Sequence, residues 1–203
     1  SPKYHVVVAN PPYMGGKGMN AKLGDFAKSN FPASKSDLFA MFMERSLQMN
    51  VRYGMMSMIN MQAWMFLSTY EKLRSNLFSE ATLVSMAHLG ERGFDSIGGA
   101  VVSTTAFVFK HERKSNQSGK FVRLVEGRSE AEKSKILRSV AQGVQQENLH
   151  TARTSSFEKI PGCPVAYWVS DEVVSAFQDA DLVAERAKKG ITTGDNEKFM
   201  RFW

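Results

Sequence analysis

The residues best suited to chemistry are the four in the run Asn10-Pro11-Pro12-Tyr13. The side chain of Asn10 offers a carbonyl oxygen, and Pro11 offers a backbone carbonyl that its rigid neighbours direct outward. Together these acceptors can take both hydrogens of a planar –NH2 group, and the Tyr13 ring can stack on the ring that carries the amine. The run therefore predicts a site for an aromatic amine, although a Pro-Pro turn with a surface tyrosine would show the same residues.

The preceding segment, His5–Ala9, would position these groups. It contains three consecutive valines, which predicts a buried strand that is apolar on both faces. Pro11 and Pro12 end this strand, because a proline donates no ladder hydrogen bond and has a fixed φ. Asn10 would then lie at the carboxyl end of a strand, where open α/β sheets bind their ligands.

The order of the following elements predicts an α/β fold. Residues 14–35 have no periodicity and are interpreted as a long mobile loop, either a lid or a disordered connector. Ser36 is expected to cap a helix whose apolar stripe runs from Leu38 to Val51. Further patterns predict a strand at 55–59, a helix that starts in a capping box at Ser68, and strands at 81–89 and 100–109. This order indicates a doubly wound sheet whose last two strands form an antiparallel hairpin.

The remaining residues predict a smaller unit and a connector. We expect a strand at 120–125, a helix at 128–146, a short strand at 165–168 and a short helix at 171–177. The predicted organisation is a sheet domain over 1–111, an α+β extension over 112–160 and a connector over 161–203.

Composition allows several partners and excludes a few classes of site. A formal net charge of +6 permits nucleic acid as a partner without requiring it. The single cysteine, Cys163, excludes an internal disulfide framework and a cysteine-based zinc site, and suits a reducing cytoplasm. We expect a cytoplasmic protein, because no apolar run approaches the ~18 residues needed to span a membrane. We also expect no metal-binding residues.

Two motifs resemble a known family. Asn10-Pro11-Pro12-Tyr13 resembles the motif of the amino-group methyltransferases, above all the N6-adenine DNA methyltransferases. Residues 189–196 (Lys-Gly-Ile-Thr-Thr-Gly-Asp-Asn), with Phe199 and Trp203, are similar to the connector before the target-recognition domain in large adenine methyltransferases. These include the type IIG restriction–modification enzymes and the BREX phage-defence methyltransferases.

The resemblance implies a reaction and roles for residues. It implies that S-adenosylmethionine donates a methyl group to N6 of an adenine flipped out of double-stranded DNA. The four-residue motif would hold the amine, and Tyr13 would stack on the base. Phe94 is the residue to which a second stacking role transfers, with a hydrophobic plug in a tight loop as the alternative. Trp64, near the predicted ligand edge, is more consistent with the core. Candidates for contact with the DNA backbone are Lys17, Lys22, Lys28 and Lys35.

One part of the family pattern is missing, and other functions stay open. No Gly-x-Gly turn follows an apolar strand before Asn10, so we expect a fragment without the main donor-binding half, which binds S-adenosylmethionine weakly or not at all. The upstream half of the same protein would then be a partner. Alternatives are a methyltransferase of an RNA base or of a protein glutamine, and a non-catalytic scaffold. Sequence specificity, cleavage activity and oligomeric state cannot be read from these residues.

Overall fold

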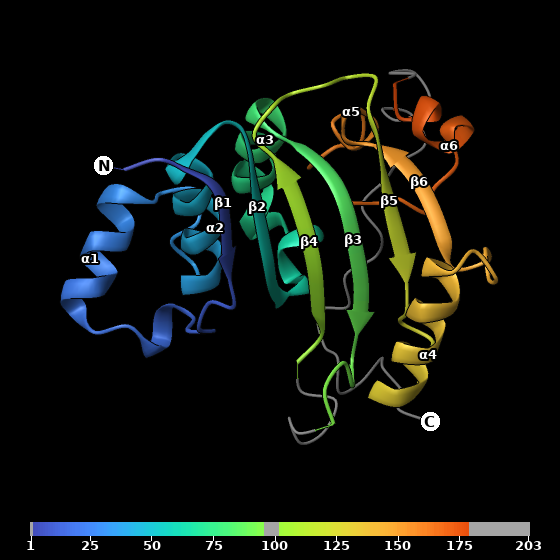
Figure 1. Cartoon of the computed structure of the whole chain (residues 1–203). Helices are drawn as coiled ribbons and strands as arrows, with labels where there is room; N and C mark the ends of the chain where they lie inside the picture. The colour runs from blue at the N-terminus through green and yellow to red at the C-terminus, as the bar shows by residue number, and fades with distance from the viewer. Residues whose placement is uncertain (1, 96–101, 179–203) are drawn as a thin grey trace, which may run out of the picture.

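The fold is built on one mixed sheet. The computed structural model describes residues 2–95 and 102–178. Its described strands are β1 (Tyr4–Ala9), β2 (Asn50–Met61), β3 (Thr82–Gly90), β4 (Thr104–Lys110), β5 (Ser118–Arg123) and β6 (Leu149–Arg153). They lie side by side in the order β1-β2-β4-β3-β5-β6 (Figure 1). The predicted α/β class is confirmed, as is the antiparallel pairing of β3 with β4.

The position of β4 determines the relative directions of the strands beside it. β4 lies between β2 and β3 and is antiparallel to both, whereas β1 is parallel to β2, and β3 is parallel to β5. Because β2 and β3 both oppose β4, they run in the same direction as each other. β5 and β6 extend the same sheet, so residues 118–153 continue it. The three-part domain division itself stays a prediction.

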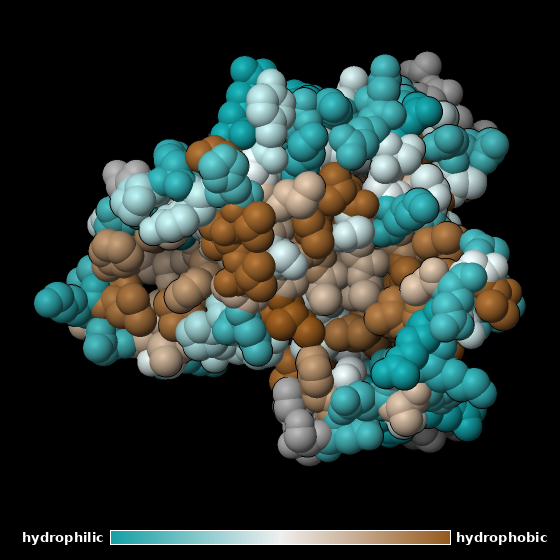
Figure 2. All heavy atoms as spheres, viewed as in Figure 1, coloured by the Kyte–Doolittle hydropathy of each residue, from teal (hydrophilic) through white to brown (hydrophobic). Residues whose placement is uncertain are grey.

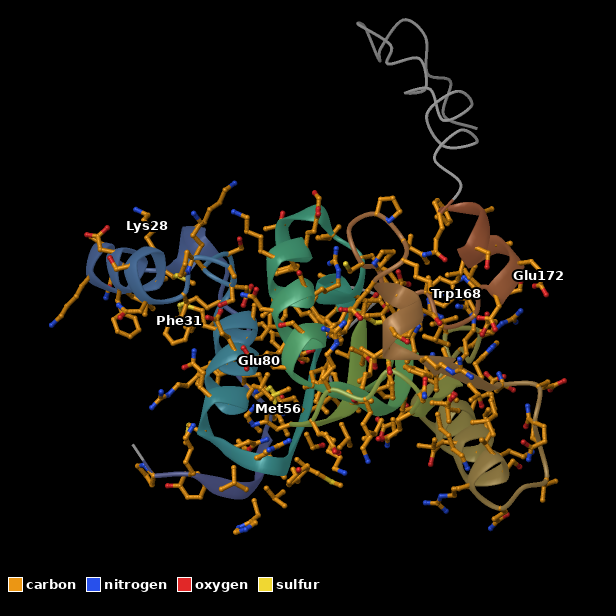
Figure 3. The ribbon with its side chains drawn as sticks, turned by 90° about the horizontal axis from the view of Figure 1, so that it is seen from above. Lys28, Phe31, Met56, Glu80, Trp168 and Glu172 are labelled. Atoms are coloured by element: carbon orange, nitrogen blue, oxygen red, sulfur yellow. The ribbon has the colours of Figure 1, made fainter. Side chains whose placement is uncertain are left out.

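Helices cover the two faces of the sheet unequally. The described helices are α1 (Ala21–Asn30), α2 (Leu38–Met49), α3 (Glu71–Glu80), α4 (Glu130–Ala141), α5 (Thr154–Phe157) and α6 (Asp171–Ala176). Seen from above, α2 and α3 lie against one face, and α4 lies against the other (Figure 3). The core fills the α2/α3 face, with fully buried side chains that include Phe39, Met56, Leu83, Phe107 and Phe121.

A buried arginine fastens the loop after β2 to the last part of the chain. Arg74, on α3, is 1% exposed. Its Nη1 donates to the carbonyls of Trp64 and Leu67, each at 2.8 Å, and its Nε donates to the carbonyl of Gly162 at 3.0 Å. These hydrogen bonds compensate for removing the guanidinium charge from water. Trp64 itself is fully buried against Phe107, which agrees with its assignment to the core.

The first strand is not buried as the sequence predicts. Val6 is 59% and Val8 is 73% exposed. β1 is the outermost strand of the described sheet, and no described helix covers the face of β1 turned toward the viewer in Figure 1. Apolar side chains gather on the face in view over β1 and its neighbours (Figure 2). A run of valines indicates that a strand is suited to burial on both faces, and within the described residues only one face is partly covered.

The stretch after the corner is also more ordered than predicted. Residues 14–35 contain the helix α1, whose first turn is capped by Asn20, since its Oδ1 accepts from the backbone N–H of Leu23 at 2.9 Å. Gly24 and the polar residues around it obscured this helix in the sequence. The cap of α2 is Asp37 and not Ser36.

The last third differs from the prediction in two further places. Residues 165–168 form no strand, and the strand of this region is β6, at Leu149–Arg153. The capping box at Ser68 does not form, because the helix α3 starts at Glu71, after a 3-10 turn over Ser68–Tyr70, and no side chain caps it. The other predicted elements are present with shifted ends.

Candidate functional site

The candidate site lies where three strands end together. β1, β2 and β3 run in the same direction, so their carboxyl ends meet at one edge of the sheet. Asn10 follows β1, Gln62 follows β2, and the turn at 90–95 follows β3. This is the edge at which α/β sheets bind ligands.

The corner itself presents an amide and a ring to the surface. Asn10 is exposed, and within the described residues its side chain makes no hydrogen bond. Pro11 is buried, which fixes the backbone that carries its carbonyl, and Tyr13 is 36% exposed. The amide of Asn10 and the ring of Tyr13 are therefore both free to meet a ligand.

The far end of the corner is held by Asp37. The backbone N–H of Met14 donates to Oδ1 of Asp37 at 3.0 Å, and the N–H of Leu38 donates to the carbonyl of Met14 at 3.1 Å. The same carboxylate oxygen accepts from the N–H of Phe39 at 3.3 Å. A carboxylate at a helix N-terminus is also favoured by the helix dipole. Asp37 thus joins the corner to the first turn of α2.

An aromatic series stands behind the corner. The Tyr13 ring meets the ring of Phe39 edge to face, with centroids 6.1 Å apart, and Phe39 lies 5.6 Å from Tyr70. Burial, and next the negative charge of Asp37, raise the pKa of Tyr13 and raise that of Tyr70 to about 12. Both phenols therefore stay neutral, as a stacking surface requires.

A second group of side chains occupies the same edge on the far side of β4. His88, near the end of β3, is 4% exposed and lies 2.7 Å from Oε1 of Gln62 through Nε2 and 2.9 Å from the hydroxyl of Tyr167 through Nδ1. The Tyr167 ring stacks on Phe121 at 4.9 Å. We call Gln62, His88 and Tyr167 the histidine relay. The sequence did not predict this group, and its only signal was that Gln62 follows a strand at the ligand edge.

Several buried polar atoms near this edge lack a partner. The side-chain amide of Asn60 and the indole N–H of Trp64 are fully buried, and neither has a hydrogen-bond partner among the described residues. Asn60 lies near the end of β2, two residues after Met58, which pairs with Ala9 of β1. Buried groups without partners cost free energy, and in native proteins they are associated with internal water or with function.

One known protein family matches the first part of the chain. Residues 1–94 match the Eco57I restriction-modification methylase family. This match spans 94 of the 203 residues of the chain.

Two relatives match all or nearly all of the chain. It is 44% identical to the adenine-specific methyltransferase BrxX of Escherichia coli O9:H4 (strain HS) over 202 residues, which is 99% of this chain and 16% of BrxX. It is 40% identical to the adenine-specific methyltransferase PglX of Lacticaseibacillus casei (strain Zhang) over 206 residues, 100% of this chain and 17% of PglX. The chain therefore spans about one sixth of the length of these relatives.

Solved structures share the fold. The type IIG restriction endonuclease BpuSI superposes with a TM-score of 0.58 at 15% identity, over 84% of this chain and 21% of that one. The methyltransferase subunit of a type I restriction–modification system from Streptococcus thermophilus gives a TM-score of 0.52 at 16% identity, over 77% and 36% of the two chains. The predicted methyltransferase fold is confirmed.

Phe94 follows a different strand of this edge from the one that carries the corner. It is half-buried after β3, and both β2 and β4 lie between β3 and β1. The same turn is tied to α4, since the N–H of Asp95 donates to a carboxylate oxygen of Glu130 at 3.1 Å. A stacking role for Phe94 therefore stays a prediction.

The four candidate lysines lie together on the α1 side. All are exposed, and Lys28 points outward from α1 in Figure 3. Lys28 and Lys35 line a hollow of about 460 Å³ beside the start of α1. Lys28 also forms an exposed ion pair with Asp25 at 3.4 Å. Their contact with DNA stays a prediction.

The described residues fit an amine better than they fit the methyl donor. The corner offers acceptors for N–H groups, but within residues 2–95 and 102–178 no further strand lies beyond β1. The sheet therefore provides no glycine-rich strand end next to Asn10 that could cradle S-adenosylmethionine. The described helices include none that is long and apolar enough to cross a membrane, and the described residues hold no cluster of three or more potential metal ligands.

Proposed function

We propose that this chain supplies the base-binding side of a site-specific DNA methyltransferase that acts on N6 of adenine. The observation that carries the proposal is the corner at the end of β1: an exposed amide on Asn10, a carbonyl on a fixed Pro11, and a Tyr13 ring held by Phe39. The relatives BrxX and PglX are adenine-specific methyltransferases, which supports adenine as the base.

The chemistry assigned to the corner is the positioning of an amine. The exocyclic nitrogen of adenine is a poor nucleophile because its lone pair is delocalised into the ring. When Asn10 Oδ1 and the Pro11 carbonyl each accept one of its hydrogens, the lone pair can turn out of the ring plane. Such positioning lowers the barrier without a strong base, because the groups are held before the reaction begins.

Stacking would offset the cost of removing the adenine from the duplex. Flipping a base costs a few kcal/mol, and each stacked base regains roughly 1–3 kcal/mol on an aromatic side chain. Tyr13 is the ring placed for this purpose, since its other side is supported by Phe39. The second ring assigned to this role is Phe94.

The methyl group would come from S-adenosylmethionine, in agreement with the methyltransferase fold. The sulfonium carries an activated methyl and leaves as a neutral thioether. Residues beyond those described here would hold most of that donor. A protein of this kind would act in restriction–modification or another phage defence, with double-stranded DNA as its partner and the exposed lysines of the α1 side near the phosphates.

The proposal is tested with two asparagines of the same chain in the full-length protein. Asn10→Ala removes one acceptor and is expected to lower methyl transfer to DNA by about a hundred- to a thousandfold, with an unchanged melting temperature because Asn10 is exposed. Asn76→Ala, at an exposed position on α3, is the matched control and should transfer methyl groups at the wild-type rate. Near wild-type turnover by Asn10→Ala would overturn the assignment.

The alternatives are separated by substrate. Equal amounts of duplex DNA, RNA and protein are offered with labelled S-adenosylmethionine, and label in N6-methyladenine of DNA alone is expected. Label in RNA or in a glutamine side chain would replace DNA as the substrate. Absence of label in all three, with a folded protein and bound donor, would favour a scaffold.

A further inference from the structure

We propose that Gln62 contacts the DNA directly, as a hydrogen-bond donor to an acceptor atom on or beside the flipped nucleotide, and that His88 and Tyr167 are positioning residues that aim it. This inference rests on the proposed function and names a further residue of the same site. Gln62 follows β2, the strand next to the corner, and both lie on the carboxyl edge of the sheet.

The relay holds one end of the Gln62 amide and leaves the other free. His88 Nε2 lies 2.7 Å from Gln62 Oε1, and His88 Nδ1 lies 2.9 Å from the hydroxyl of Tyr167. Oε1 can only accept, so Nε2 must carry the hydrogen and Nδ1 must accept from the Tyr167 hydroxyl. Every polar atom of the relay is thereby used except the amino group of Gln62.

The environment of His88 keeps this hydrogen pattern at neutral pH. Burial, assisted by the positive charge of Arg123, lowers the pKa of His88 to about 4, although the Glu126 carboxylate opposes the shift. A neutral ring has one donor and one acceptor, which is what the two neighbours need. A doubly protonated ring would place a donor against the Tyr167 hydroxyl and could still be accommodated, but the burial of the ring disfavours the charge.

Gln62 belongs to the lining of a hollow at the ligand edge. Gln62 lines a hollow of about 320 Å³ with Met61, Ala63, Phe66, Leu67 and Ser103. Most of this lining is apolar, so the Gln62 amide is its main side-chain polar group. An N–H pair in an apolar hollow suits an acceptor, such as a ring nitrogen or a carbonyl of a base, or a phosphate oxygen. Oε1 already accepts from His88, so the amino group is the part of the Gln62 amide without a partner among the described residues.

The hollow is held in shape from two sides. The backbone N–H of Gln62 donates to the carbonyl of Ser103 at 2.9 Å, and the N–H of Val165 donates to the carbonyl of Met65 at 3.0 Å. Arg74 fixes the carbonyls of Trp64 and Leu67, on the same loop. A donor on such a loop needs little reorganisation when DNA arrives, which is the condition for an effective binding contact.

The first experiment compares four single variants of the full-length protein by steady-state kinetics. Gln62→Ala is expected to raise KM for DNA about tenfold, which corresponds to one lost hydrogen bond of about 1.4 kcal/mol, while KM for S-adenosylmethionine stays the same. Tyr167→Phe keeps the ring on Phe121 and removes only the hydroxyl, so a smaller rise of about threefold is expected. His88→Phe should resemble Gln62→Ala. His150→Phe is the control, because His150 also touches the Tyr167 ring, at 5.4 Å, but is outside the relay.

Two further variants separate direct contact from a structural role. Gln62→Glu keeps an acceptor for His88 but has no N–H to give, so KM for DNA should rise at least as much as in Gln62→Ala. If Gln62 only supported the loop, Gln62→Glu would behave as wild type, and that result would overturn the proposal. The double variant Gln62→Ala/Tyr167→Phe should be no worse than Gln62→Ala, since a positioning residue has nothing left to position. Additive losses would contradict the relay.

The nature of the acceptor is identified with modified DNA. 7-Deaza-adenine lacks N7, and 1-deaza-adenine lacks N1. If one of them at the target position removes the difference in KM for DNA between wild type and Gln62→Ala, the missing nitrogen is the acceptor. With a methylphosphonate beside the target, the same loss assigns it to the phosphate. A difference that persists in all three substrates would show that none of these three groups receives the hydrogen bond and would overturn their assignment as the acceptor.

Failure of this inference is distinguishable from failure of the proposed function. If Asn10→Ala is inactive while Gln62→Ala and Gln62→Glu match wild type, the methyltransferase corner stands and the role of Gln62 is wrong. In the 203-residue chain itself, ¹⁵N chemical shifts of His88 should report a neutral ring with its hydrogen on Nε2. A hydrogen on Nδ1 would reverse the orientation of the Gln62 amide and remove the free donor.

Discussion

The two ends of the carboxyl edge of the sheet differ in how firmly the described residues hold their side chains in place. At the β1 end, Asn10 is exposed, and β1 presents Val8 at 73% exposure. At the β3 end, His88 is 4% exposed, and Tyr167 is stacked within an aromatic core. The corner is fastened mainly through Asp37, whereas the relay is enclosed on several sides.

This difference bears on how the site would work. A group that is already fixed adds affinity at little cost, whereas an exposed group gains its geometry only when a ligand or another part of the protein covers it. We infer that the β3 end is prepared within this chain, and that the β1 end reaches its working geometry in contact with the bound base and the donor-binding residues.

The largest expected difference between the two ends is in stability. Phe121→Ala removes a fully buried ring under Tyr167 and should lower the free energy of unfolding by about 3–5 kcal/mol. Val8→Ala, on the exposed face of β1, should change it by less than about 0.5 kcal/mol. Urea unfolding of both variants measures this pair. Similar losses in the two would mean that β1 is as well packed as the core, which would remove the contrast.

The second prediction concerns acid, and it tests the β3 end alone. Because the pKa of His88 in the folded chain is about 4 and that of an unfolded histidine is about 6.5, the unfolded state binds more protons between these values. The stability contribution is therefore complete above about pH 6.5 and is lost as the pH falls toward 4, by up to roughly 3 kcal/mol. Arg123, Glu126 and Lys133 are the charged groups that act on this ring.

The measurement is the free energy of unfolding of wild type and His88→Phe across this pH range. The variant should be less stable at pH 7, with a shallower decline between pH 6.5 and 4. His150→Phe serves as a comparison, because burial also lowers the pKa of His150 but without a relay around it. An identical slope in wild type and His88→Phe would show that His88 does not titrate with the folded state.

A third prediction tests how the corner is fastened. Asp37→Ala removes the acceptor shared by the N–H groups of Met14 and Phe39, and should cost about 1–2 kcal/mol of stability. Asp37→Asn keeps a side-chain oxygen and should recover most of that loss. In the full-length protein, methyl-transfer activity should follow the same order, because Met14, the neighbour of Tyr13, loses its hydrogen bond to Asp37. Full activity in Asp37→Ala would mean that the corner holds itself without α2.

The corner could be predicted from the sequence because its chemistry is local. Asn10, Pro11 and Tyr13 are neighbours in the chain, and a valine run with two prolines fixes where a strand ends. The antiparallel pairing of β3 with β4 followed from a hairpin pattern of the same local kind, whereas the pairing of β4 with β2 was not predicted. The burial of β1 could not be predicted, because the exposure of a strand depends on what lies beside it in space.

The relay could not be found for the opposite reason. His88 is 26 residues from Gln62 and 79 residues from Tyr167 along the chain. No local sequence pattern joins residues so far apart. The predicted strand at 165–168 was wrong because this apolar run satisfies its burial by packing aromatic rings against β5, and not by pairing in the sheet. The helix α1 was missed because Gly24 and several polar residues mask its cap at Asn20.

The smallest expected effect concerns the lysines of the β1 end. Each phosphate contact contributes about one unit to the slope of log affinity against log salt concentration, because it releases a counterion. Lys35→Gln, in the hollow beside α1, should reduce that slope by about one unit and weaken DNA binding to the same degree for every sequence. Lys72→Gln, an exposed lysine on α3, should leave the slope unchanged. Fluorescence anisotropy of labelled duplex DNA with the full-length protein, over a range of salt, measures both. Equal slopes in the two variants would place the α1 side away from the phosphates, and DNA would then approach the carboxyl edge from the relay end.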